Sequence, residues 1–131
     1  MKKNQIEQRI NNALIMAFSI PLEVIKSNSN ERGLVDKRHI ICYWMYQYTR
    51  VSTSKIGLII NRDHTTVIHG RKKIQNLIDS KNREIINDYQ KFCYYMENVD
   101  YMPLVRYIAD LPEKERNFVI ENVQKMLSEA K

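Results

Sequence analysis

Glycine and proline are scarce in this chain, with three residues of each among 131. A β-sandwich or β-barrel turns about every 8–12 residues, and glycine and proline build many of those turns. The scarcity therefore argues against an all-β architecture, whereas 44% hydrophobic residues are enough to form a core. We expect one ordered, all-α domain, or a small domain with an extension.

Apolar residues recur along the chain at the spacing of one helix face. Ile6, Ile10 and Leu14 predict an amphipathic helix over about residues 3–17. Spacing and capping residues predict later helices over about residues 21–26, 36–48, 54–60, 64–78, 83–97, 102–110 and 112–127. Asp36 is expected to cap the helix that buries Ile40, Ile41, Trp44, Met45 and Tyr48. The last helix is expected to bury Val119, Val123, Met126 and Leu127.

The sequence lacks the signals that mark several classes of protein. No apolar run approaches about 18 residues, so we expect no membrane-spanning helix, and residues 1–5 do not resemble a signal peptide. Cys42 and Cys93 have no metal-ligand spacing and are expected to be buried thiols in a reducing cytoplasm. His64 and His69 are five residues apart and face different ways on a helix, which argues against a metal site. We expect no catalytic residues, no cofactor and no metal.

The charge is unevenly distributed. Residues 1–83 contain 15 Lys and Arg against 6 Asp and Glu, whereas residues 84–131 contain 6 against 9. A basic front half suggests a nucleic-acid partner, and an acidic rear half suggests a different task. Charges scattered over a solvated surface would give the same totals, so other features must decide.

Residues 54–78 have the pattern of a short helix, a tight turn and a longer helix that is typical of a helix-turn-helix. A short helix ends at Asn61, which tolerates the left-handed conformation, and Asp63 can cap a longer basic helix. Short polar side chains then stand at the start of that helix, where a recognition helix contacts base edges. Gly70 would let a neighbouring helix approach closely.

The aromatic residues upstream of this segment allow two interpretations. Tyr43, Trp44, Tyr46 and Tyr48 are spaced mostly around a core helix, which predicts packing. The alternative is a stacking platform for single-stranded nucleic acid.

Residues 62–74, Arg-Asp-His-Thr-Thr-Val-Ile-His-Gly-Arg-Lys-Lys-Ile, resemble the signature of the C-terminal DNA-binding domain of DnaA, the bacterial chromosomal replication initiator. The resemblance covers roughly residues 3–80. It implies an all-α helical bundle with a helix-turn-helix, of the TrpR-like type. We expect this DNA-binding domain over residues 1–82 and a helical extension over residues 83–131.

The resemblance also implies roles for individual residues. Five residues match positions that family members insert into the major groove: Asp63, His64, Thr65, Thr66 and His69. Those expected at the phosphate backbone are Lys37, Arg38, His39, Thr53, Ser54, Arg62, Lys72 and Lys73. Arg32 is the only basic residue in the loop over residues 28–33, where the family places its minor-groove arginine, and is assigned that role.

The sequence departs from the complete initiator in one important way. No Gly-x-x-x-x-Gly-Lys-Ser/Thr loop occurs, so no nucleotide-binding site is expected. The Gly-Gly usual in the family before Arg-Asp-His is also absent, and Asn61 stands in a turn one residue shorter. We expect a free-standing DNA-binding domain, as a phage or mobile element encodes.

Two functions remain open from sequence. The first is sequence-specific binding of double-stranded DNA in replication initiation or its regulation. The alternative is a protein-interaction module or transcriptional regulator whose acidic tail docks a partner. For residues 83–131 we consider folding back on the first domain, docking another protein, or pairing with a second copy, and we hypothesise a dimer.

Overall fold

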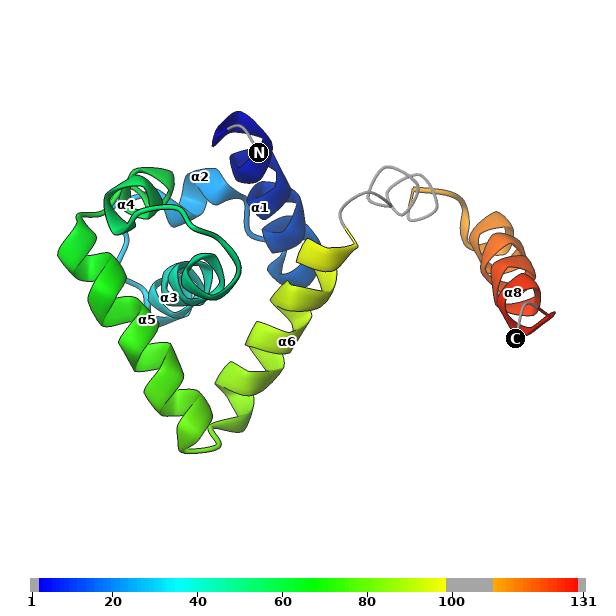
Figure 1. The fold of residues 1–131 in the computed structure, drawn as a ribbon. Coiled ribbons are helices and arrows are strands. Elements are labelled where there is room, and N and C mark those ends of the chain that lie inside the picture. The colour runs from blue at the N-terminus through cyan, green and yellow to red at the C-terminus, as the bar shows by residue number, and fades with distance from the viewer. Residues whose placement is uncertain (1–2, 99–109, 130–131) are drawn as a thin grey trace. The chain divides into compact units, whose positions relative to one another are not determined.

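The computed structural model describes residues 3–98 and 110–129, and every regular element in these ranges is an α-helix, which confirms the all-α prediction. The helices are α1 (Lys3–Phe18), α2 (Leu22–Ile25), α3 (Arg32–Tyr48), α4 (Thr53–Ile60), α5 (His64–Asp79), α6 (Arg83–Glu97) and α8 (Glu113–Glu129) (Figure 1). The helix predicted over residues 102–110 falls outside the described ranges. The chain divides into two compact units, Met1–Val99 and Asp100–Lys131.

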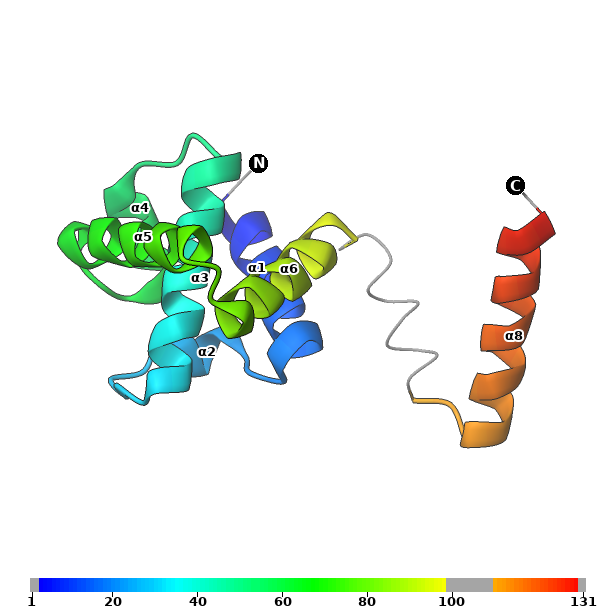
Figure 2. The ribbon, with the colours of Figure 1, turned by 90° about the horizontal axis from the view of Figure 1, so that it is seen from below.

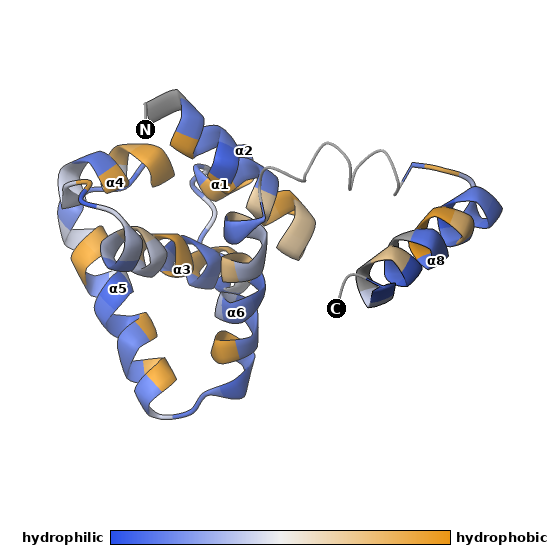
Figure 3. Ribbon diagram, turned by 45° about the vertical axis from the view of Figure 1, so that its right-hand side comes forward, coloured by the Kyte–Doolittle hydropathy of each residue, from blue (hydrophilic) through white to orange (hydrophobic). Residues whose placement is uncertain are grey.

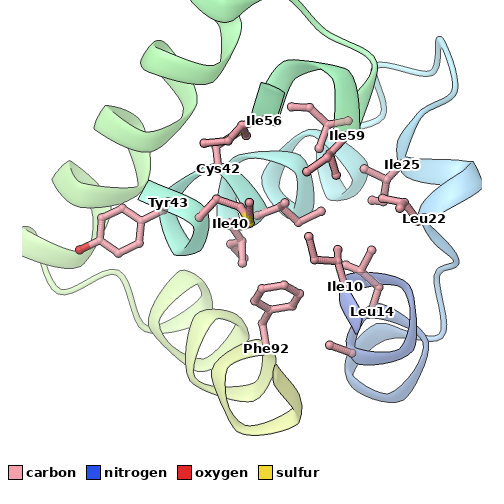
Figure 4. Packing of buried hydrophobic residues seen from close by; sticks show 14 of the residues in the cluster. Ile10, Leu14, Leu22, Ile25, Ile40, Cys42, Tyr43, Ile56, Ile59 and Phe92 are labelled. Carbon is pink, nitrogen blue, oxygen red and sulfur yellow. The ribbon is translucent and has the colours of Figure 1, made fainter. Parts of the chain in front are cut away.

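Helix α3 forms the centre of the first unit. Figures 1 and 2 show α5 crossing it on one side, with α1 and α6 lying side by side on another. In Figure 4 the side chains of Phe92 and Ile10 point towards Ile40 and Cys42 of α3. The buried side chains thus come from helices that are far apart in the sequence, and they form one continuous core.

Helix α6 packs into this same unit. Ile85, Phe92 and Met96 are buried on its inner face, and both Nε and Nη2 of Arg9 donate hydrogen bonds to the Met96 carbonyl at 3.0 and 2.6 Å. The folding-back interpretation is therefore confirmed for residues 83–97. The domain boundary after residue 82 remains a prediction, with α6 packed against the helices that precede it.

The start and end of α3 differ from expectation. The helix begins at Arg32, so the prediction that Asp36 caps it was wrong; Glu31 stands at the N-cap without a side-chain hydrogen bond. Burial of Leu34 in the core stabilises the additional helical turn at the start of α3. Tyr48 was expected inside but is 64% exposed; it is the last residue of the helix.

The second unit contains α8. Phe118 and Met126 on this helix are each 68% exposed, so the prediction that Met126 is buried was wrong. Figure 3 shows apolar residues interspersed along α8, and no second helix lies among the described residues of its unit to cover them. The side chains of residues 123 and 127 are outside the described part. No helix among the described residues is both long and apolar enough to span a bilayer.

Candidate nucleic-acid interface

The turn between α4 and α5 is held by its own backbone. Asn61 adopts the left-handed conformation with φ 58°, and the Arg62 amide donates to the Gly57 carbonyl at 2.8 Å. A Cβ on Gly57 would collide with the Arg62 carbonyl oxygen, so only glycine lets the turn return this close to α4. The predicted turn at Asn61 is confirmed.

Asp63 begins α5 as its N-cap. Its carboxylate accepts a hydrogen bond from the Thr66 amide at 2.9 Å, which confirms the predicted cap. That bond holds the pKa of Asp63 below its usual range, since it favours the charged form. The first turn of α5 therefore carries a carboxylate, and His64 and Thr65 beside it are exposed.

One face of α5 is buried and the opposite face is open. Val67, Gly70 and Ile74 are packed inside. Thr65 and Lys72 are separated by seven residues, so with His69 they share the exposed face. The five side chains expected at base edges are thus gathered on the first two turns of α5 and its cap, with Thr66 half-buried among them.

The middle of α5 lies against α3 at His39. A Cβ on Gly70 would be 2.5 Å from the His39 Cδ2 atom, which confirms the predicted close approach. Burial lowers the pKa of His39, and the positive charge of Lys73 lowers it further. The imidazole is therefore neutral near pH 7, and its Nδ1 is buried without a hydrogen-bond partner in the described structure.

Three of the basic residues expected at phosphates are engaged inside the protein. Arg38 is only 3% exposed and donates to the carbonyl oxygens of Ile25, Ser27 and Ser29 at 2.6–3.1 Å. Arg62 donates to the same Ser27 carbonyl at 2.7 Å. The Lys37 ammonium is 2.8 Å from the carboxylate of Asp88.

A sequence signal for the burial of Arg38 existed. It stands four residues after Leu34 and three before Ile41, on the face that is buried. An arginine on an apolar face requires internal acceptors, which the last residue of α2 and the chain after it supply.

Of the remaining predicted residues, Ser54, Lys72 and Lys73 are exposed, whereas Thr53 and His39 are half-buried. Arg32, the first residue of α3, is exposed. Thr53 and Ser54 open α4, where Ser52 accepts from the Lys55 amide at 3.3 Å as the cap. Backbone N–H groups at such a helix start are suited to bind anions.

The four aromatic residues Tyr43, Trp44, Tyr46 and Tyr48 differ in their burial. Tyr43 is buried and Trp44 half-buried, as the packing prediction requires. Tyr46 and Tyr48 are exposed, and the Arg71 guanidinium lies 3.9 Å above the Tyr46 ring. The packing prediction was therefore wrong for these last two.

The two cysteines are free thiols. Cys42 is buried as expected, and burial raises its pKa to about 12, which removes it as a nucleophile at neutral pH. Cys93 is only half-buried. No group of three or more His, Cys, Asp or Glu side chains that could hold a metal occurs within residues 3–98 and 110–129.

Comparison with known proteins identifies one family. The family described as "Bacterial dnaA protein helix-turn-helix" matches residues 8–74, just over half of the chain. The chain is 34% identical over 77 residues to the chromosomal replication initiator protein DnaA of Flavobacterium psychrophilum, covering 56% of this chain and 16% of that protein. The Ureaplasma parvum protein of the same name is 28% identical over 85 residues, covering 64% and 19%. That of Bacteroides thetaiotaomicron is 38% identical over 63 residues, covering 47% and 13%. The chain therefore spans less than a fifth of the length of these relatives.

Proposed function

This chain belongs to the bacterial DnaA helix-turn-helix family, and on that premise we propose that it is a sequence-specific binder of double-stranded DNA. One observation carries the proposal: the first turn of α5 presents His64 and Thr65 to solvent directly behind a capped, tightly held turn. A recognition helix uses its N-terminal residues in this way to reach base edges in the major groove.

Each side chain on this turn offers distinct chemistry to a base pair. Thr65 and Thr66 provide a hydroxyl group and a methyl group, which suit a thymine and its neighbour. His64 and His69 can donate or accept hydrogen bonds. The Asp63 carboxylate can accept from a cytosine amino group, in addition to capping the helix.

We propose a smaller set of phosphate contacts than the family resemblance implies. Lys72 and Lys73 on α5, Thr53 and Ser54 at the start of α4, and His39 remain in it. Arg38, Lys37 and Arg62 leave the set, because their charged groups already bind protein atoms. Arg32 is exposed and remains the proposed minor-groove residue.

The process we propose is replication initiation or its regulation, since the relatives are named as chromosomal replication initiators. This chain covers only a small part of those proteins, so their other activities are not transferred to it.

A second candidate function is supported by α8. Phe118, Ile120 and Met126 expose apolar surface on this helix, which a protein partner or a second copy of the chain would cover. A dimer would bind paired half-sites separated by about one helical turn of DNA. Light scattering of the full chain distinguishes a dimer from a monomer, and a monomer leaves α8 as a docking helix.

The direct test is selection of bound sequences from a random duplex pool. We expect one sequence class to be enriched. On that sequence, Thr65→Ala should weaken binding by about 1–3 kcal/mol and leave binding to random duplex nearly unchanged. Gln90→Ala, which alters an exposed polar residue on α6, serves as the control.

Equal losses by Thr65→Ala on selected and random duplexes would refute the base-reading role. A salt titration on random duplex separates the two candidate functions, because a DNA binder loses affinity steeply as salt rises. A flat salt dependence would favour the protein-interaction alternative.

A further inference from the structure

A groove of about 780 Å³ opens on the first unit, and none of its lining residues belongs to α5. It is bordered by α1, the end of α3, the following loop and α4. Its aliphatic lining comes from Ile6, Val51, Leu58 and Ile59. Leu58 is 63% exposed, although Ile59 beside it is buried in the core.

The rim of this groove is basic. Arg9, Arg50 and Lys55 line it, and no Asp or Glu is among its lining residues. Arg50 and Lys55 are exposed, and within the described residues neither side chain forms an ion pair or a hydrogen bond. Arg9 keeps its bonds to the Met96 carbonyl. The groove therefore combines an apolar floor with two unpaired positive charges.

Such a groove suits an amphipathic helix. Helix-in-groove recognition lays an apolar stripe into a hydrophobic channel, and opposite charges along the edges set the partner's identity. A partner helix with Leu-type residues at i, i+3 or i+4, and i+7 would cover Leu58. Glu or Asp on its flanks would face Arg50 and Lys55.

Single-stranded nucleic acid fits this groove less well. Stacking of bases needs free aromatic faces. Trp44 is half-buried between the Tyr48 ring at 5.4 Å and the Phe92 ring at 6.3 Å, centroid to centroid, which leaves Tyr48 as the one exposed ring of the groove. The aliphatic floor also offers nothing that a base would stack on.

We propose that this groove docks an acidic amphipathic helix of another protein. The groove shares no residue with the proposed DNA contacts, although Ser52 and Lys55 of its lining flank Thr53 and Ser54 in the sequence. Leu58→Asp changes the groove away from that helix start.

The test uses the full chain and a display library of 16-residue, helix-forming peptides with randomised faces. Selection is made on the wild-type protein, with counter-selection on Leu58→Asp. We expect enriched peptides to share one apolar stripe and to carry more Glu and Asp than Lys and Arg. Measured by fluorescence anisotropy, the best peptide should lose about tenfold or more in affinity to Leu58→Asp.

Two further variants check charge and specificity. Arg50→Glu with Lys55→Glu should weaken the same peptide by about tenfold and reduce the salt dependence of its binding. Val24→Asp is the matched control, because Val24 is an exposed aliphatic residue on α2 outside the groove, and it should bind the peptide within about twofold of wild type. Far-UV circular dichroism and urea unfolding show that each variant is folded.

The proposal is overturned by any of four results. The first is a selection that yields no peptide able to distinguish wild type from Leu58→Asp, and the second is a selection that yields only basic peptides. Oligo(dT) binding that Leu58→Asp abolishes would instead assign the groove to single-stranded nucleic acid. A wild-type dimer that Leu58→Asp dissociates would assign it to a second copy of the chain.

Discussion

Replacing Gly57 with alanine should destabilise the turn that presents α5. The added Cβ would meet the Arg62 carbonyl oxygen, which belongs to the backbone and cannot rotate away as a side chain can. The turn would have to move outwards, weakening the bond from the Arg62 amide to the Gly57 carbonyl. The substitution therefore strains the connection between α4 and α5 directly.

Opposing effects set the change in the free energy of unfolding that Gly57→Ala causes. Alanine gains about 1 kcal/mol over glycine inside a helix. Overpacking against fixed atoms costs up to about 3 kcal/mol, and weakening one hydrogen bond costs up to about 1 kcal/mol. We expect Gly57→Ala to lower the free energy of unfolding by about 2 kcal/mol.

The other two glycines provide matched comparisons. A Cβ on Gly70 would meet the His39 ring, which is packed but is not backbone, so Gly70→Ala should cost about 1 kcal/mol. A Cβ on Gly33 meets nothing within 4 Å, so Gly33→Ala should stabilise α3 by about 0.5 kcal/mol. The free energy of unfolding should therefore be highest for Gly33→Ala, lower for Gly70→Ala and lowest for Gly57→Ala.

Urea unfolding followed by tryptophan fluorescence measures this order. Trp44 is the only tryptophan of the chain and lies in the first unit, so its signal reports that unit alone. If Gly57→Ala proves as stable as Gly33→Ala, the argument from backbone contact is refuted.

Three further results are expected. Lys73→Ala should lower the salt slope of binding by about one on selected and random duplexes alike, and an unchanged slope would remove Lys73 from the phosphate contacts. Arg38→Ala should cost about 3 kcal/mol in the free energy of unfolding, because three carbonyls lose their donor; a lower salt slope with intact stability would contradict this structural role. Because burial lowers the pKa of His39 on folding, the unfolded chain binds more protons, and stability should fall as pH drops below 6.5. Urea midpoints at about pH 7.5 and 5.5 should therefore differ less in His39→Gln than in wild type.

The sequence by itself determined the features that depend on neighbouring residues. Helical spacing of apolar residues located the six described helices of the first unit, with most boundaries within a few residues. Asn61 and Asp63 marked the turn and the cap because left-handed backbone and N-capping are set by the local chain. The polar first turn of α5 could be predicted for the same reason.

Only the tertiary structure decided which polar groups are free to meet a ligand. Arg38 looked like a phosphate contact, but its guanidinium reaches carbonyls 9 to 13 residues earlier in the chain. Tyr48 follows the apolar pattern of its helix and yet remains exposed beside the groove. Burial depends on where distant helices pack, and helical periodicity carries no information on which of several apolar faces finds a partner.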